Sequence, residues 1–158
     1  MPAFVQQAVD WWSSAFASHI AVSALVIFAH VAGVVVAGGT ALWTDRAILG
    51  AATPADRERV LAELPGVHRV VLRALALVIA AGVLLALADL ESLLPAPAYR
   101  VKLTAVALLL ANGWQLQRAE RKAASGAPRD WTRLRTSARL SRVLWFATIL
   151  AGVVVAER

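Results

Sequence analysis

The sequence predicts an all-α integral membrane protein, a four-helix up-and-down transmembrane bundle with an N-terminal amphipathic interfacial helix. Three observations predict this class. The chain of 158 residues is 59% hydrophobic with a mean hydropathy of +0.66, which points away from ordinary soluble domains. Four apolar stretches approach the roughly 20 residues that a helix needs to cross about 30 Å of hydrocarbon. The basic residues gather in two of the connections between these stretches.

Residues 1–18 are predicted to form the amphipathic helix. Their apolar side chains fall on one helical stripe, opposite the polar ones. Trp11 and Trp12 within this stretch are typical of a helix that lies in a membrane interface. The predicted organisation is therefore an interfacial helix over 1–18 and a membrane domain over 19–158.

Four spans make up the predicted membrane domain. They cover residues 19–43, 67–88, 98–116 and 137–156. Their alanine content favours helices over the strands of a barrel, and short connections favour antiparallel neighbours. Gly33, Ala37 and Ala41 recur at four-residue intervals in the first span. Such a small-residue ridge indicates close helix contact, or space for a flat cofactor.

A short surface helix is expected between the first two spans. Thr53 is a suitable N-cap, with Pro54 at the first helical position and Asp56 in the first turn. Pro65 and Gly66 are expected to end this helix, because proline cannot donate the next backbone hydrogen bond.

The distribution of charge predicts how the protein lies in the membrane. Of 16 Lys and Arg residues, 13 lie in or beside the two connections between spans one and two and spans three and four. The positive-inside rule places both connections in the cytoplasm and both termini outside. The predicted location is the bacterial inner membrane, with several passes.

Composition also excludes several classes of function. The chain has no cysteine, which excludes disulfides and thiolate metal sites. It has no aromatic-basic motif for binding nucleic acid. His68 lies roughly 20 Å from His30 at 1.5 Å per residue, so the two cannot hold one metal ion. Asp45 and Asp89 are expected to be solvated at helix ends.

Three polar residues stand within the predicted spans, namely His30, Lys102 and Asn112. Such residues are rare in membranes and mark functional sites. Helix rise puts His30 roughly 16 Å into its span and Asn112 roughly 15 Å beyond Lys102. A hydrogen bond between His30 and Asn112 is then the simplest account of both, and with Lys102 they are predicted to bound a polar pocket. Lys102 is also explained by snorkelling to the interface.

A heme is the rival explanation for His30, since a neutral imidazole beside small residues suits a buried macrocycle. Arg100 is then the nearest basic candidate for a propionate partner. A separate stripe of arginines opens the fourth span at i, i+4 and i+7. Its members, predicted to contact anionic lipid head groups at about 1 kcal/mol each, are Arg135, Arg139 and Arg142.

Two stretches resemble a known family. "HVAGVVVAGGTALWTDRAIL" and "YRVKLTAVALLLANGWQLQRAERK" are similar to the small four-span bacterial protoporphyrinogen oxidases. In that family a histidine of the first span and a lysine of a "KLxxVxLLL" stretch are implicated in binding heme b. The resemblance implies His30 and Lys102 as ligands of the heme iron. Asn112 and Gly113 stand where the family usually has a histidine, and "TDRAILG" is closer to a related four-span family with no assigned function.

These features leave two functions open. One is a non-catalytic accessory or bracing subunit of a larger bacterial membrane complex. Its partners would be the bilayer, anionic lipids and other membrane subunits or a second copy of the chain. The alternative is a heme b-binding redox protein, so the sequence does not decide whether the chain is an enzyme. A transporter is disfavoured, because no internal repeat or broken helix is visible.

Overall fold

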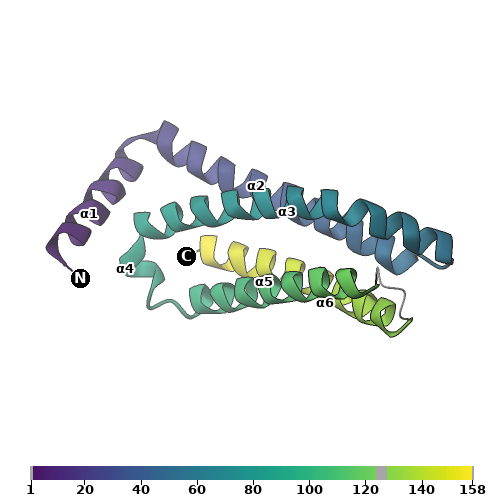
Figure 1. Ribbon diagram of the computed structural model, residues 1–158. Coiled ribbons are helices and arrows are strands. Elements are labelled where there is room, and N and C mark those ends of the chain that lie inside the picture. The colour runs from purple at the N-terminus through teal and green to yellow at the C-terminus, as the bar shows by residue number, and fades with distance from the viewer. Residues whose placement is uncertain (1, 124–127, 158) are drawn as a thin grey trace.

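The computed structural model describes residues 2–123 and 128–157, which form helices joined by short connections (Figure 1). No strand occurs among these residues. The helices are α1 (Ala3–Ser18), α2 (Ile20–Gly50), α3 (Pro54–Ala88), α4 (Leu90–Leu93), α5 (Pro97–Ala123) and α6 (Pro128–Ala156). The all-helical class predicted from the sequence is confirmed.

Three of these helices are long and apolar enough to cross a membrane. They are α2, α3 and residues Trp131–Ala156 of α6. Helix α5 was predicted as a span over 98–116, but Arg100, Lys102 and Asn112 lower its hydropathy. The structure therefore supports a membrane protein with three apolar helices, and the fourth span stays a prediction.

The four long helices are arranged as two hairpins. Helices α2 and α3 pack along their length, as do α5 and α6, and the two hairpins meet mainly where α2 contacts α6. We call the end of the bundle that holds residues 51–53 and the start of α6 the loop end. The opposite end, which holds α1, α4 and the C-terminus, is the terminal end (Figure 1).

Helix α3 is continuous, and the expected break at Pro65 is wrong. Its start is as predicted: Thr53 accepts from the Asp56 backbone N–H at 3.2 Å, and the Asp56 side chain accepts from the Thr53 backbone N–H at 3.0 Å. Pro65 lies inside the helix. The preceding Leu64 is only 1% exposed, so its burial holds the chain helical past the proline, whose missing donor affects only the local turn.

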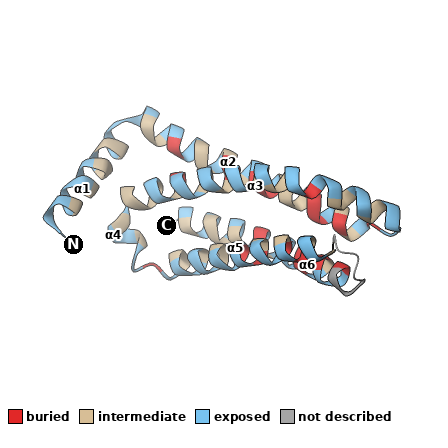
Figure 2. Cartoon of the chain, in the orientation of Figure 1, coloured by how far each residue is buried: buried red, intermediate tan, exposed pale blue. Residues whose placement is uncertain are grey.

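The larger cluster of buried apolar residues in the described part of the chain lies at the loop end. Figure 2 shows the buried residues gathering at this end of the bundle. The members of this loop-end core are Ile48, Ala51, Leu64, Leu116, Ala119, Trp131, Leu134 and Ala138. Helix α3 has 35 residues, which is about 52 Å of helix against about 30 Å of hydrocarbon. Helix α3 is therefore longer than the hydrocarbon layer that it would cross.

Helix α1 is tied to the far end of α3. The Trp12 indole N–H donates to the Leu84 carbonyl and the Ser13 hydroxyl donates to the Ala88 carbonyl, both at 2.8 Å. Carbonyls in the last turn of a helix lack partners within it, so Ser13 supplies one. The predicted helix over 1–18 exists as Ala3–Ser18, and its place in a membrane interface stays a prediction.

Candidate functional site

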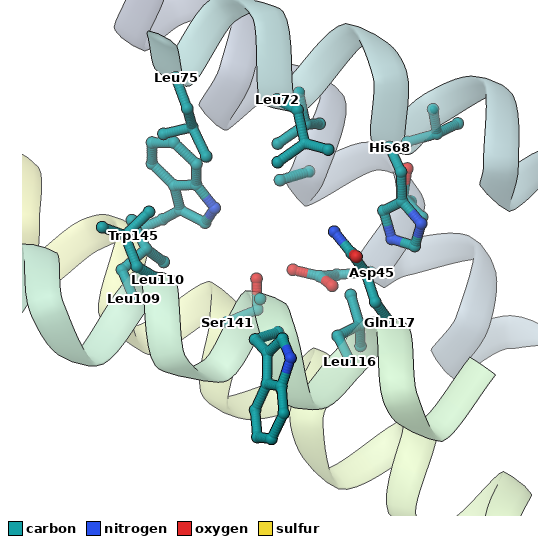
Figure 3. Close-up of a pocket in the computed structure, with 16 residues that line it drawn as sticks. Asp45, His68, Leu72, Leu75, Leu109, Leu110, Leu116, Gln117, Ser141 and Trp145 are labelled. Atoms are coloured by element: carbon teal, nitrogen blue, oxygen red, sulfur yellow. The ribbon is translucent and has the colours of Figure 1, made fainter. Parts of the chain in front are cut away.

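A cavity lies between the two hairpins, towards the loop end, and all four long helices contribute to its wall (Figure 3). Its volume is about 280 Å³, near the lower end of the range for small-molecule sites. Most of its lining is apolar, including Leu72 and Leu75 of α3, Leu109 of α5 and Trp145 of α6. A few polar side chains converge on this apolar space, as they do in binding pockets.

Asp45 is the most deeply buried of these polar side chains. It is 1% exposed, and one of its carboxyl oxygens, Oδ2, has no hydrogen-bond partner. Figure 3 shows the carboxyl directed into the cavity, with the Ser141 hydroxyl facing it from α6. A buried carboxyl oxygen left without a hydrogen-bond partner costs about 1–3 kcal/mol. The free oxygen therefore calls for a partner that donates a proton or carries positive charge.

His68 and Glu120 link the two hairpins beside the cavity. The Nδ1 atom of His68 on α3 lies 3.0 Å from Oε2 of Glu120 on α5. Burial raises the pKa of the Glu120 carboxyl, and the positive charge of Arg121 opposes that rise. The other ring nitrogen of His68, Nε2, is buried without a partner. This couple thus offers a second polar group at the edge of the cavity.

Gln117 completes the polar set. In Figure 3 its amide extends from α5 into the cavity, towards Asp45. Thr44 also lines the cavity, but its hydroxyl donates to the Thr40 carbonyl at 2.8 Å. The groups that face the apolar space are therefore a carboxyl, an imidazole, an amide and a hydroxyl, and together they can hold a polar head group.

The predicted hydrogen bond between His30 and Asn112 is wrong. Nδ1 of His30 lies 3.0 Å from the Val78 carbonyl of α3. Asn112 is 3% exposed and donates to the Ser137 carbonyl of α6 at 3.1 Å. Each side chain thus bonds within its own hairpin. Helix α2 begins further toward the terminal end than α5 does (Figure 1). Counting residues from the start of each helix therefore placed Asn112 too near the terminal end.

Lys102 lies beside Gly152 of α6, where an added Cβ would be 3.9 Å from its Nζ. The single pocket that His30, Lys102 and Asn112 were predicted to bound stays a prediction. Arg100 is exposed, and its guanidinium donates to the Pro95 carbonyl at 3.4 Å.

The donors near His30 suit a heme iron in part. Histidines that bind metals usually donate their other ring N–H to a carbonyl or carboxylate, and the contact with Val78 provides such a bond. Within the described residues no cluster of three or more His, Cys, Asp and Glu side chains could hold a metal ion.

The small-residue ridge packs against a neighbouring helix at Gly33. A Cβ on Gly33 would lie 2.7 Å from Cγ2 of Val78, and one on Gly38 would lie 3.1 Å from the Trp145 ring. The reading of the ridge as close helix contact is therefore confirmed at Gly33. A flat cofactor has no free space at this glycine.

Comparison of the chain with family models, with curated proteins and with solved structures finds no match. The resemblance to the four-span oxidase family stays a prediction.

Asp45 is the site residue that the sequence analysis missed. Its expected solvation at a helix end is wrong, because α2 continues to Gly50 and α6 covers this turn. A signal was present in the spacing. Asp45 lies eight residues after Ala37 and three before Ile48, on the stripe that both of these buried residues share.

Proposed function

We propose that this protein binds a small amphipathic molecule of the membrane in the cavity around Asp45. The observation that carries the proposal is the free carboxyl oxygen of Asp45, which faces an otherwise apolar space. A buried acceptor without a partner is costly in the empty protein. A ligand that donates a hydrogen bond there removes this cost.

The lining defines the chemistry of the ligand. Its body is apolar and flat enough to lie between leucine side chains and the Trp145 ring. Its head carries a hydroxyl or an ammonium group, because Asp45 offers an acceptor. Lipid-soluble quinols and phenols have such a head, as do lipophilic amines. His68 and Gln117 provide the further polar contacts that orient the head.

The route to the cavity lies between α3 and α5. These helices belong to different hairpins, and few of their residues come close to one another, whereas α2 and α6 are in direct contact. Trp114 and Leu110 of α5 line the cavity and are exposed on the outer surface of the bundle. A molecule dissolved in the bilayer therefore meets the cavity from the side.

Fluorescence of the cavity tryptophans tests this proposal. The full chain in nanodiscs is titrated with a decyl-substituted hydroquinone and, separately, with decylammonium. Asp45→Asn is expected to weaken binding about 10- to 100-fold, since a hydrogen bond to a charged group contributes about 1.5–3 kcal/mol. Glu91→Gln, an exposed acid on α4, is the matched control.

A second pair of variants tests whether filling the cavity prevents binding. Gly113 lines the cavity, and a Cβ there would meet nothing within 4 Å. Gly113→Leu is expected to fill the cavity and abolish binding while the protein stays folded. Gly39→Leu places the same side chain at an exposed glycine with equal space. If Asp45→Asn and Gly113→Leu bound both probes as well as their controls do, the proposal would be wrong.

A second candidate function is heme binding at His30. The bond from Nδ1 of His30 to the Val78 carbonyl favours it, because that bond leaves Nε2 free to act as a ligand. When bound, a heme would supply one-electron chemistry. An absorption spectrum of the purified protein tests this candidate: a Soret band that disappears in His30→Ala supports it, and a colourless wild-type protein rejects it.

The accessory role predicted from the sequence stays a prediction. The cavity proposal is compatible with it, because a subunit of a larger assembly can also hold a ligand. Placement in the inner membrane with both termini outside likewise stays a prediction.

A further inference from the structure

A second, polar cavity lies at the loop end, on the outside of the bundle. Its volume is about 330 Å³. The first turn of α3 contributes Arg57, and α6 contributes Trp131, Arg135 and Arg139 together with two threonines. Among the described residues that line it there are three guanidinium groups and no carboxylate, so they form a local concentration of positive charge.

Two of these guanidinium groups are held in place by their neighbours. Arg57 lies over the Trp131 ring, 5.3 Å from its centroid, a distance at which a cation is attracted to the face of an indole. Arg135 donates to the Leu49 carbonyl at 3.4 Å. Trp131 is itself part of the loop-end core and is 6% exposed. The site is therefore built on rigid elements from two different helices.

The same groups have unused donors. The Nε atoms of Arg57 and Arg135 are buried and have no hydrogen-bond partner. A buried donor without an acceptor is costly, and more so when it is charged. An anion with several acceptor oxygens relieves this cost at both arginines. The planar fork of arginine matches the oxygens of phosphate better than a lysine ammonium does.

We infer that Arg57, Arg135 and Arg139 form a binding site for a phosphate group. This site differs from the stripe predicted from the sequence. It gains Arg57 from another helix, and it excludes Arg142, whose charge acts on Asp45 instead. The phosphate can belong to the head group of an anionic phospholipid or to a free phosphate ion, because both present the same oxygens to the arginines.

Lipid retention on the full-length protein tests the site. The protein is reconstituted in equal amounts of phosphatidylglycerol and phosphatidylcholine, and retained lipid is counted by native mass spectrometry. Arg57→Gln and Arg135→Gln are each expected to lower the preference for phosphatidylglycerol about five- to tenfold. Arg59→Gln removes the same charge from an exposed position two residues along α3 and is expected to change little.

A second arm distinguishes the two sources of phosphate. The protein in phosphatidylcholine alone is titrated with inorganic phosphate by calorimetry. If only the phosphate titration depends on Arg57 and Arg135, the ligand is a free phosphate. If only lipid retention depends on them, the ligand is a phospholipid head group. Arg139→Gln, at an exposed side chain, serves if the other variants fail to fold. The inference is overturned if none of the site variants differs from Arg59→Gln in either arm.

Discussion

The loop end and the terminal end of the bundle are held together in different ways. At the loop end, large apolar side chains such as Ile48, Leu64 and Leu134 are at most 1% exposed. Towards the terminal end the close contacts are made at glycines: Gly82 lies against His30, and Gly152 lies beside Lys102. Burial of large apolar side chains marks one end, and polar side chains that lie against glycines mark the other.

The difference follows from the solvent that each end is expected to meet. In hydrocarbon an apolar side chain gains little from being buried, so helices associate through small residues and polar contacts. In water the same burial contributes about 25 cal/mol per Å². We therefore expect the loop end to be the more stable part of the bundle.

Truncating a core leucine is the strongest test of this contrast. Leu134→Ala at the loop end is expected to destabilise the protein by about 2–5 kcal/mol, because it leaves a cavity in a packed core. Leu150→Ala near the terminal end removes a side chain that is 65% exposed, and little change is expected. Thermal unfolding in detergent, followed by circular dichroism, compares the two. Equal losses would show that the ends do not differ.

Adding a methyl group tests the close contacts nearer the terminal end. Gly33→Ala brings a Cβ to 2.7 Å from Cγ2 of Val78, and it is expected to cost about 1–3 kcal/mol by overpacking. Gly39→Ala meets nothing within 4 Å and is expected to be neutral. The same unfolding measurement applies. Val78→Ala should rescue Gly33→Ala, and a failure to rescue would place the cost elsewhere.

The burial of Glu120 makes a smaller, pH-dependent contribution to the stability of the loop end. Since burial raises the pKa of Glu120 in the folded protein, the folded state binds this proton more tightly than the unfolded state does. The contribution is full below the ordinary pKa of 4.5 and is lost as pH rises through the folded value. Glu120→Gln should flatten this part of the melting curve against pH, whereas Glu91→Gln should not. An unchanged slope in Glu120→Gln would contradict the prediction.

The smallest expected effect concerns the attachment of α1 at the terminal end. Ser13→Ala removes one hydrogen bond to the Ala88 carbonyl, worth about 0.5–1.5 kcal/mol. Faster proteolysis near His19, where α1 meets α2, is the expected readout. Ser14→Ala is the control, because Ser14 is next to Ser13 on α1 and its hydroxyl makes no hydrogen bond to the described residues of α3. Equal cleavage rates would mean that Ser13 does not hold α1 in place.

The sequence predicted the helices better than it predicted their partners. Local signals were sufficient for the start of α3, where Thr53 and Asp56 form the expected cap. They misplaced its end, because the burial of Leu64 overrides the local preference of Pro65. Helix propensity acts within a few residues, whereas burial depends on a helix far away in the chain.

The site was harder to predict for the same reason. His30 is half-buried and Asn112 is buried, but spacing within one helix does not say which neighbour each will face. Asp45 was judged by its place at the end of an apolar run. Only the packing of α6 across that turn makes it a buried carboxyl.

The arrangement as two hairpins has a consequence for synthesis. Contacts within each hairpin are local in the chain, and such contacts form early and fast. We expect α2 and α3 to assemble while the remaining helices are still being translated. The contact of α2 with α6 can form only after α6 has been synthesised. Asp45 and Ser141 therefore come together at the end of folding. The cavity is then the final part of the protein to take shape, and a ligand present in the membrane could be captured as the fold closes around it.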